Sequence, residues 1–278
     1  MTTSAEVPPV PRSGLALLRA AHIGPTIAVT SVVALLAVGQ DLPLARGVIV
    51  TAAVLAGQLT IGWGNDLVDA GRDRQAGRLD KPLANGELSV SVVRASLAVA
   101  AVACVVLSFL VGWRSAVVHL GLGVGCGHLY NLVLKSTPWS WLPYAVAFGT
   151  LPAVVTLADV PHHWPPLWMM ASAAALGVAA HFLNALPDFA TDAATGVRGL
   201  PHVLGATASR AVATVLLVVA SVVAALGPAG APTTWAWTAL AVVAALAFVT
   251  ATGHGKAPFA AAVAIALVDV LLLTVVSG

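Results

Sequence analysis

Stretches of about twenty residues without a formal charge recur along this chain of 278 residues. In the first two thirds of the chain they cover residues 20–40, 47–65, 95–113, 115–134, 136–158 and 160–187. A helix of roughly 20 apolar residues is long enough to cross the hydrocarbon core of a bilayer. Only 9% of the residues are charged, against about a quarter in soluble domains, so lipid is the expected solvent.

The last part of the chain follows the same pattern. Residues 211–255 carry no formal charge, and the turn-forming segment Gly-Pro-Ala-Gly-Ala-Pro at 227–232 divides them into two helices. Residues 257–278 contain a single acid, Asp269. Together these stretches predict an all-α membrane protein with about nine transmembrane helices.

The distribution of Lys and Arg predicts the orientation in the membrane. With a cytoplasmic N-terminus and nine spans, eleven of the thirteen basic residues fall on the cytoplasmic side, and only Arg46 and Arg114 fall outside. We therefore expect a multi-pass protein of the cell membrane. Residues 1–14 are polar and rich in proline, so we expect a disordered tail before a single transmembrane domain at 15–278. The net charge of +2 is small and gives no indication of nucleic-acid binding.

Seven of the eleven acidic residues lie in two clusters, each after a long apolar stretch. Both clusters contain the pattern Asn-x₃-Asp-x₃-Asp. The residues are Asn65, Asp69 and Asp73 in the first motif, and Asn184, Asp188 and Asp192 in the second. The same offset of 119 residues also aligns Gly77, Pro82 and Gly86 with Gly196, Pro201 and Gly205. The match predicts an internal repeat, in which helices 1–4 correspond to helices 5–8.

The spacing within each motif indicates a ligand site. Residues four apart lie on one face of a helix, so each motif predicts a stripe of oxygen ligands. Both motifs are expected on the cytoplasmic side, where facing stripes would place four carboxylates and two amide oxygens around one site. Such ligands suit Mg²⁺, which commonly bridges carboxylates to substrate phosphates. The alternative is that these acids are solvated loop residues paired with neighbouring arginines.

Basic side chains near the motifs are candidate partners for a phosphate group, because Lys and Arg form charge-assisted hydrogen bonds with phosphate oxygens. They follow the first motif, the second motif or the fourth expected helix: Arg72, Arg78, Lys81, Arg198 and Lys135. Each of them is also explained as a residue that only fixes the orientation in the membrane.

The two motifs resemble those of the UbiA superfamily of intramembrane prenyltransferases. The first motif is followed by Lys81-Pro82-Leu83, and the resemblance extends to the segments at 18–25 and 130–135. It covers nearly the whole chain. Many members carry arginine where this chain has Lys81, and a lysine offers phosphate only a point charge.

The resemblance implies a nine-helix bundle with a central cavity that opens to lipid. It also implies an enzyme that binds an isoprenoid diphosphate through Mg²⁺ and transfers the prenyl group, in most members to an aromatic acceptor. The implied Mg²⁺ ligands are Asn65, Asp69, Asp73, Asn184, Asp188 and Asp192, with the four aspartates as catalytic residues. The implied diphosphate contacts are Lys81, Lys135 and Arg19.

Other polar residues within the expected spans are candidates for the acceptor pocket: Gln58, His128, Tyr130 and His181. Polar side chains are rare inside a membrane and are functional candidates there. Each of these four is also explained by a hydrogen bond between helices. Asp269 is expected to face the interior of the bundle and has no assigned catalytic role.

Other functions are compatible with the same motifs. A UbiA-type terpene cyclase would ionise the same donor and close it into a ring, and a third activity in the superfamily transfers a phosphoribosyl group to a polyprenyl phosphate. A secondary transporter also contains repeats and intramembrane acids, but near the middle of the membrane. Aromatic transfer is favoured over cyclisation because the chain has only six Phe and two Tyr, whereas a cyclase is expected to shield cations with aromatic rings.

Overall fold

The computed structural model describes residues 13–189, 191–192 and 196–276, and within these ranges every regular element is helical. The first half contains α1 (Ser13–Ala20), α2 (Ile23–Gly39), α3 (Leu44–Gln75), α4 (Val90–Val111), α5 (Trp113–Val117), η1 (Val118–Val124), α6 (Gly125–Leu129) and η2 (Tyr130–Leu134). The second half contains α7 (Leu142–Gly149), α8 (Leu151–Thr156), α9 (Leu167–Ala185), η3 (Leu186–Asp188), α11 (Leu200–Leu204), α12 (Ala206–Leu226), α13 (Thr234–Thr252) and α14 (Ala257–Val276). The all-α prediction is confirmed. Of the tail expected at 1–14, only Ser13 and Gly14 are described, and both already belong to α1.

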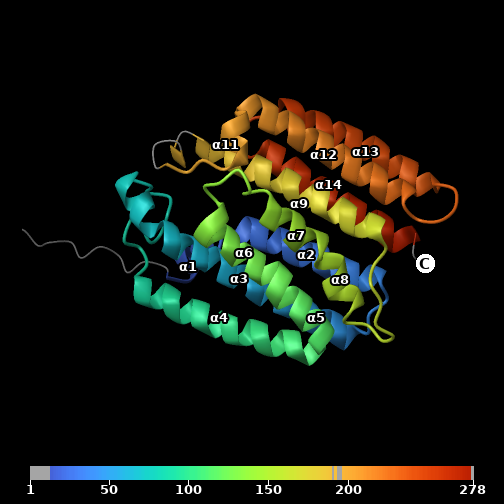
Figure 1. Ribbon diagram of the computed structural model, residues 1–278, viewed down its shortest axis with the longest axis horizontal. Coiled ribbons are helices and arrows are strands. Elements are labelled where there is room, and N and C mark those ends of the chain that lie inside the picture. Colours follow the sequence, from blue (N-terminus) through green and yellow to red (C-terminus); the bar gives the residue numbers. More distant parts are fainter. Residues whose placement is uncertain (1–12, 190, 193–195, 277–278) are drawn as a thin grey trace, which may run out of the picture.

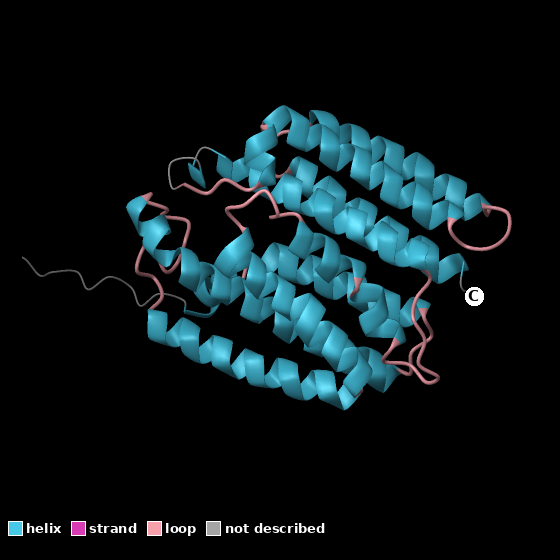
Figure 2. Cartoon of the chain, in the orientation of Figure 1, coloured by secondary structure: helices cyan, strands magenta, loops and turns pink. Residues whose placement is uncertain are grey.

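Long apolar helices lie side by side in the bundle (Figures 1 and 2). Among the described residues, six helices are long and apolar enough to cross a membrane, and α1 with α2 makes a seventh if this bent pair is one span. Leu142–Thr156 and Ala257–Leu272 are shorter apolar helices. The count of nine spans therefore stays a prediction.

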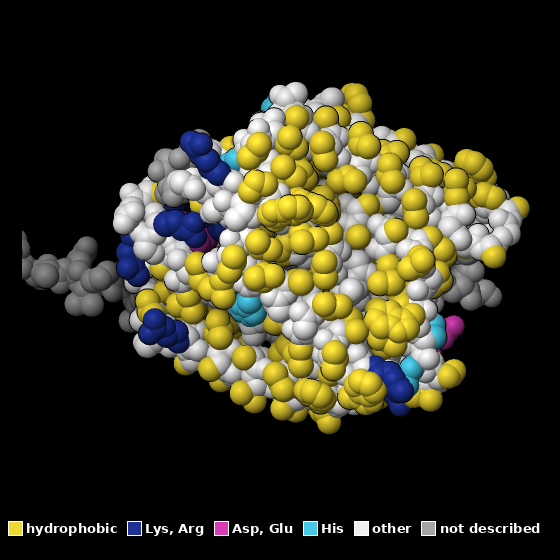
Figure 3. Space-filling view, viewed as in Figure 1, with side chains coloured by type: hydrophobic (Ala, Val, Ile, Leu, Met, Phe, Trp, Pro, Cys, Tyr) yellow, Lys and Arg dark blue, Asp and Glu magenta, His cyan; other side chains and the backbone are white. Residues whose placement is uncertain are grey.

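The surface separates apolar and charged side chains. Most of the face in Figure 3 is hydrophobic, while Lys and Arg gather at the end where α1 and α11 lie. The exposed apolar residues of α4 include Val99, Val102 and Phe109. Since such side chains are costly to expose to water, this outer surface suits contact with lipid tails.

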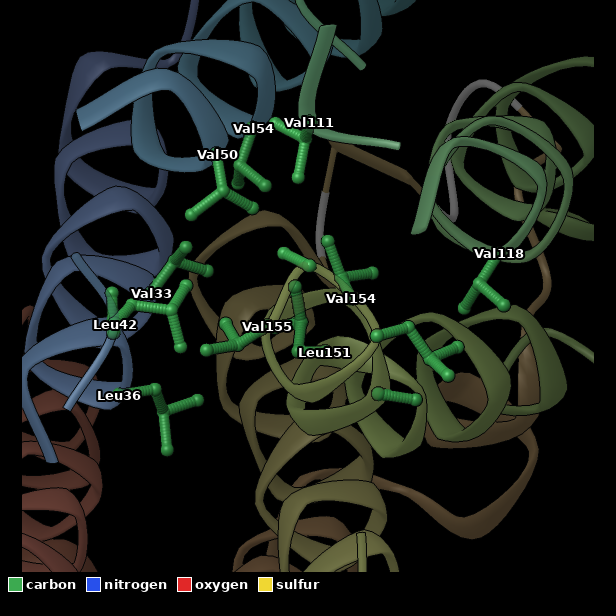
Figure 4. Close-up of a cluster of buried hydrophobic side chains, with 14 of the residues drawn as sticks. Val33, Leu36, Leu42, Val50, Val54, Val111, Val118, Leu151, Val154 and Val155 are labelled. Carbon is green, nitrogen blue, oxygen red and sulfur yellow. The ribbon is translucent and has the colours of Figure 1, made fainter. Parts of the chain in front are cut away.

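A buried cluster at the opposite end from the basic residues joins the two halves of the bundle. Valines and leucines of α2, α3 and α8 meet there, among them Val33, Val54 and Val154, which are at most 1% exposed (Figure 4). Lipid tails are as apolar as these side chains, so close packing, more than exclusion from water, stabilises such contacts.

Pro25 explains why α1 and α2 are separate helices. A proline has no N–H to donate and its ring clashes with the carbonyl four residues earlier, which is that of Ala21. The axis bends by 74° at this point, and His22 adopts a left-handed backbone conformation with φ of 53°. The freed carbonyl of Ala21 accepts a hydrogen bond of 2.9 Å from the Thr26 hydroxyl.

The backbone after the two acidic motifs repeats the same geometry. Gly77 and its counterpart Gly196 have φ of 64° and 78°, and Gly86 and Gly205 both have φ of 83°. These positive values favour glycine, which has no Cβ to clash. The amide of residue 78 donates to the carbonyl of 73 at 3.0 Å, and the amide of 197 donates to the carbonyl of 192 at 2.9 Å. The duplication seen in the sequence is therefore also a duplication of turns.

The two motifs differ in the helix that carries them. The first motif lies entirely within α3, which continues to Gln75, so its three ligands share one helix as the spacing predicts. The second does not lie on one α-helix, because α9 ends at Ala185 and a 3₁₀ turn follows at Leu186–Asp188. Pro187 accounts for the difference, since it cannot continue the α-helical hydrogen bonds. The second motif is therefore helical in its described residues but is interrupted by this 3₁₀ turn.

Gly62 provides a test of the packing around the α1–α2 break. A Cβ at Gly62 would lie 2.3 Å from the carbonyl oxygen of Ala21, whereas a Cβ at Gly71 on the same helix would meet nothing within 4 Å. We expect Gly62→Ala to lower the free energy of unfolding by about 1–3 kcal/mol through overpacking. Gly71→Ala is the matched control and should be neutral or slightly stabilising. Thermal unfolding in detergent measures both, and equal stabilities of the two variants would contradict this packing.

Candidate active site

A cavity of about 230 Å³ lies between the two halves of the bundle, bounded by α2, α3, α7, α9 and the helical segment at 118–134. Both acidic motifs line it: Asn65, Asp69, Asp73, Asn184, Asp188 and Asp192. The segment at 118–134 contains two π-helical stretches, Val118–Val124 and Tyr130–Leu134, which turn His119, Tyr130 and Asn131 toward the cavity. The two motifs therefore converge on one site, as the sequence predicts.

Asp69 of the first motif is buried and fully compensated by charge. One of its carboxylate oxygens accepts a hydrogen bond from Arg72 and the other accepts one from Lys135. The amide of Asn65 donates to the side-chain oxygen of Asn131 at 3.1 Å, and Asn131 in turn donates to the carbonyl of Ile61 at 3.0 Å. This pair of bonds leaves the amide oxygen of Asn65 available to a ligand.

Asp73 and Asn184 differ from Asp69 because their side chains have no hydrogen-bond or ion-pair partner among residues 13–189, 191–192 and 196–276. Both line the cavity, one from each motif. Carboxylate and amide oxygens without a direct partner in the described residues are suitable ligands for a hard cation.

Two basic side chains connect the motifs across the cavity. Arg78, which follows the first motif, donates to Asp188 of the second motif at 3.1 Å and to both oxygens of Asp80 at 2.9 and 2.8 Å. The Arg78 guanidinium lowers the pKa of Asp80 to about 2. Lys135 pairs with Asp69 and also acts on the charge of Asp192.

Asp192 is in an unfavourable electrostatic position for a carboxylate. Burial raises its pKa, and the neighbouring Asp188 carboxylate raises it further, although Lys135 and His202 oppose these effects. The Nε2 atom of His202 lies 3.1 Å from a carboxylate oxygen of Asp192. A raised carboxyl pKa means that the ionised form is disfavoured, so the site would gain from an additional cation.

A triad built on the buried Asp66 holds Lys81, although the spacing of the motif does not include Asp66. Asp66 is 1% exposed, and one of its carboxylate oxygens lies 2.8 Å from the Lys81 ammonium and 3.1 Å from Nε2 of His22. Lys81 also contacts His22 at 3.0 Å. Asp66 belongs to the first acidic cluster but lies outside its i, i+4 spacing, which is why the motif did not identify it. No sequence pattern indicates a functional role for His22, which lies three residues before Pro25.

Aromatic rings form another part of the wall of the same cavity that the acids line. Tyr130 and Tyr144 meet edge to face with centroids 5.1 Å apart, and Tyr144 lies 4.7 Å from the ring of His181 and 6.2 Å from Phe148. Nε2 of His181 is 3.0 Å from the Ser140 hydroxyl, so this ring is held by a neighbour. Gln58 also lines the cavity.

Four of the residues selected from the sequence do not line the cavity: Arg19, Arg72, Arg198 and His128. Arg19 forms an ion pair of 2.7 Å with Glu87, and Arg198 is exposed. Arg72 reaches the site only through Asp69. His128 contacts the Thr60 hydroxyl at 3.3 Å. These four residues therefore do not face this cavity, and their roles as ligand contacts stay predictions. Arg198 lies in the loop before α11.

In the described part of the chain, no three His, Cys, Asp or Glu side chains lie close enough together to hold a metal ion. The acids are instead compensated by arginine, lysine and histidine, as in Asp69 with Lys135 and Asp188 with Arg78. Coordination of a cation would therefore require these basic side chains to turn away from their acids. The same movement would free them for an anionic ligand.

Comparison with known proteins identifies the family. The model of the UbiA prenyltransferase family matches residues 25–271, which is most of the chain. The chain belongs to the UbiA prenyltransferase family. No curated protein matches its sequence. Family membership confirms the expected class of enzyme, a prenyltransferase, and sets aside the transporter.

Solved UbiA structures share the fold. The apo UbiA homologue from Aeropyrum pernix K1 is 17% identical with a TM-score of 0.74, and the match covers 91% of this chain and 98% of that one. A UbiA homologue from Archaeoglobus fulgidus bound to GPP and Mg²⁺ is 15% identical with a TM-score of 0.70, covering 94% and 99%. A digeranylgeranylglyceryl phosphate synthase is 15% identical with a TM-score of 0.64, covering 95% and 98%.

The buried ion pair of Asp66 and Lys81 gives a prediction that is independent of activity. Lys81→Met leaves the Asp66 carboxylate buried with only His22 beside it, and we expect a loss of about 3 kcal/mol in the free energy of unfolding. Arg19→Met removes an exposed ion pair and should cost at most about 1 kcal/mol. Thermal unfolding of both variants in the same detergent compares them. A Lys81 variant as stable as the Arg19 variant would show that Asp66 is not held in this way.

Proposed function

We propose that this UbiA family member is an intramembrane, Mg²⁺-dependent enzyme that transfers a prenyl group from an isoprenoid diphosphate to an aromatic acceptor. The proposal depends mainly on one observation: the same cavity is lined by acidic and basic side chains and by apolar and aromatic side chains. Charged groups suit a metal–diphosphate head, and apolar groups suit a prenyl tail. The A. fulgidus homologue bound to GPP and Mg²⁺ supports this choice of donor and metal.

The residues present fit a Mg²⁺ site by their chemistry. The side chains of Asp73 and Asn184 have no hydrogen-bond or ion-pair partner in the described residues, and the Asn65 amide oxygen is free. Asp192 lines the same cavity, and burial and the Asp188 carboxylate raise its pKa. We assign the metal to the six motif residues, with Asp73, Asp188 and Asp192 as its main carboxylate ligands. Bound Mg²⁺ stabilises the negative charge that develops on a departing diphosphate.

The basic residues hold the diphosphate. Lys81, Arg78 and Lys135 line the cavity and are each tied to an acid that belongs to, or lies beside, a motif. These donors already line the cavity, and a bound cation that takes their place beside the acids would free them to stabilise charge on the leaving group. Asp66 and His22 act as positioning residues, since they fix the Lys81 ammonium at the cavity wall.

The tail lies in the apolar part of the site. A second cavity of about 120 Å³ adjoins the first and shares with it Val29, Tyr144, Phe148, Leu151 and Asn184. Its walls bury a prenyl chain with a gain of about 0.8 kcal/mol for each CH₂ group. They also keep water away from the carbocation that forms when the allylic C–O bond breaks.

Gln58 is the best candidate to orient the acceptor. Its side chain lines the first cavity and has no hydrogen-bond partner among the residues that the structure describes. His181 is less available because it is paired with Ser140. A hydroxyl or carboxylate on an aromatic ring would hydrogen-bond with the Gln58 amide while the nucleophilic carbon or oxygen attacks the allylic carbon.

Cyclisation is the second candidate, and one observation favours it. Both tyrosines of the chain and Phe148 line the first cavity, so the low overall count of aromatic residues does not describe the site. Aromatic faces stabilise cations, which a cyclase needs along its reaction. The low count of aromatic residues in the whole chain is therefore no evidence against a cyclase.

The orientation is also part of the proposal. The acids and their basic partners lie at the end of the bundle where Lys and Arg gather in Figure 3. Because basic residues are enriched on cytoplasmic loops, we expect this end of the bundle to face the cytoplasm. Soluble isoprenoid diphosphates and Mg²⁺ would then reach the site from that side of the cell membrane.

The first test removes one carboxylate from each motif. Asp73→Asn and Asp188→Asn should each reduce Mg²⁺-dependent release of pyrophosphate at least about a hundredfold, because each loses a group that holds the metal and the leaving group. Asp41→Asn, in the exposed loop before α3 and at the opposite end of that helix, is the matched control. The Asp41 variant should release pyrophosphate at the rate of the wild type. Near-normal release by both motif variants would mean that the metal assignment is wrong.

The second test distinguishes transfer from cyclisation. Purified enzyme is incubated with Mg²⁺ and farnesyl or geranylgeranyl diphosphate, with and without a panel of aromatic acceptors, and the products are analysed by mass spectrometry. Transfer predicts a prenylated product only when an acceptor is present. A cyclic hydrocarbon or alcohol formed from the donor alone would replace the transferase proposal with a cyclase.

A further inference from the structure

The second cavity extends deep into the bundle. It runs along α9 from Asn184, which it shares with the first cavity, to Ser172, and twelve helical residues span about 18 Å. Apolar residues of α2, α9 and α14 form nearly all of its wall, for example Val32, Leu176 and Val263. A chain that starts at the diphosphate site and enters this cavity would point its far end toward Ser172.

Asp269 of α14 is the one residue of a charged type in the described wall of this cavity. It is 2% exposed, and its Oδ2 accepts a hydrogen bond of 2.9 Å from Ser221. Its Oδ1 is buried without a hydrogen-bond partner among the described residues. Asp269 lines the second cavity, whereas the catalytic acids line only the first.

Hydrogen bonds to α12 fix the depth of Asp269. The Ser172 hydroxyl donates to the carbonyl of Ala220 at 2.9 Å, and the next residue, Ser221, donates to Asp269. Ser172 and Asp269 therefore lie at the same level, near the end of the cavity that is remote from Asn184. This level lies beyond the reach of a short prenyl chain but within the path of a long one.

We propose that Asp269 is a specificity-determining residue that disfavours donors whose apolar tail is long enough to reach it. The proposal rests on the proposed function, because it takes the second cavity as the site of the prenyl tail. A short tail ends before Asp269 and leaves the surroundings of its carboxyl group unchanged. A long tail packs apolar carbon against a buried carboxyl group whose Oδ1 already lacks a donor, and it offers no donor of its own.

The test measures kcat/KM for pyrophosphate release with geranyl, farnesyl, geranylgeranyl and a longer polyprenyl diphosphate, using the full chain in detergent. For Asp269→Leu we expect the ratio of long-donor to short-donor kcat/KM to rise about tenfold, while the value for the short donor stays close to that of the wild type. Leucine is larger than aspartate, so added space cannot explain a gain. Asp269→Asn keeps polar atoms of the same shape and should keep the wild-type ratio.

The substitution is compatible with the fold. Without Asp269, the Ser221 hydroxyl still donates to the carbonyl of Leu217, a contact of 3.1 Å that it already makes. Should Asp269→Leu not give a monodisperse protein, Asp269→Val, which is closer in size to aspartate, replaces it with the same expected ratio. Unchanged ratios in an active apolar variant would overturn the proposal. Absence of pyrophosphate release from the wild type with every donor would instead refute the proposed function on which it rests.

Discussion

Four carboxylates around one cavity repel one another unless cations lie between them, and the other groups at this site are arranged to meet that constraint. Asp69 is compensated by Arg72 and Lys135, and Asp188 by Arg78. One of these ion pairs joins the two halves of the repeat, since Arg78 follows the first motif and binds Asp188 of the second. We infer that metal and diphosphate replace these pairs together, because the cation takes the acids while the anion takes the released bases.

Proline and glycine place the charged groups where this exchange is possible. Pro25 breaks the first span and leaves His22 beside Asp66 and Lys81. Pro187 interrupts the second motif with a 3₁₀ turn at Leu186–Asp188, after which Asp192 is again α-helical. Glycines with positive φ at equivalent positions turn the chain back after both motifs. Backbone irregularity at membrane depth is tolerated where protein or a polar cavity, and not lipid, surrounds it.

The pattern of apolar stretches and the repeated motif were sufficient to predict the class of fold, the repeat and the convergence of the acids. They could not predict which basic residues face the cavity. Arg72 and Arg78 carry the same charge, but Arg72 lies in α3 and Arg78 lies in the loop after it. Nor could composition show that Tyr130 of η2 and Tyr144 of α7 would meet edge to face in the cavity wall. Asp66 escaped notice because its partners come from distant segments, at His22 and Lys81.

The central claim is that both motifs act on one metal–diphosphate head. It is tested most directly by an experimental structure of the protein with Mn²⁺ in place of Mg²⁺ and a non-reactive prenyl thiodiphosphate, in which the metal is located by its anomalous scattering. The account predicts metal density between the diphosphate and carboxylates of both motifs, with Asp73 on one side and Asp188 or Asp192 on the other, and with Arg78 and Lys135 turned to the phosphates. Metal bound to only one motif, or a diphosphate held away from both, would contradict it.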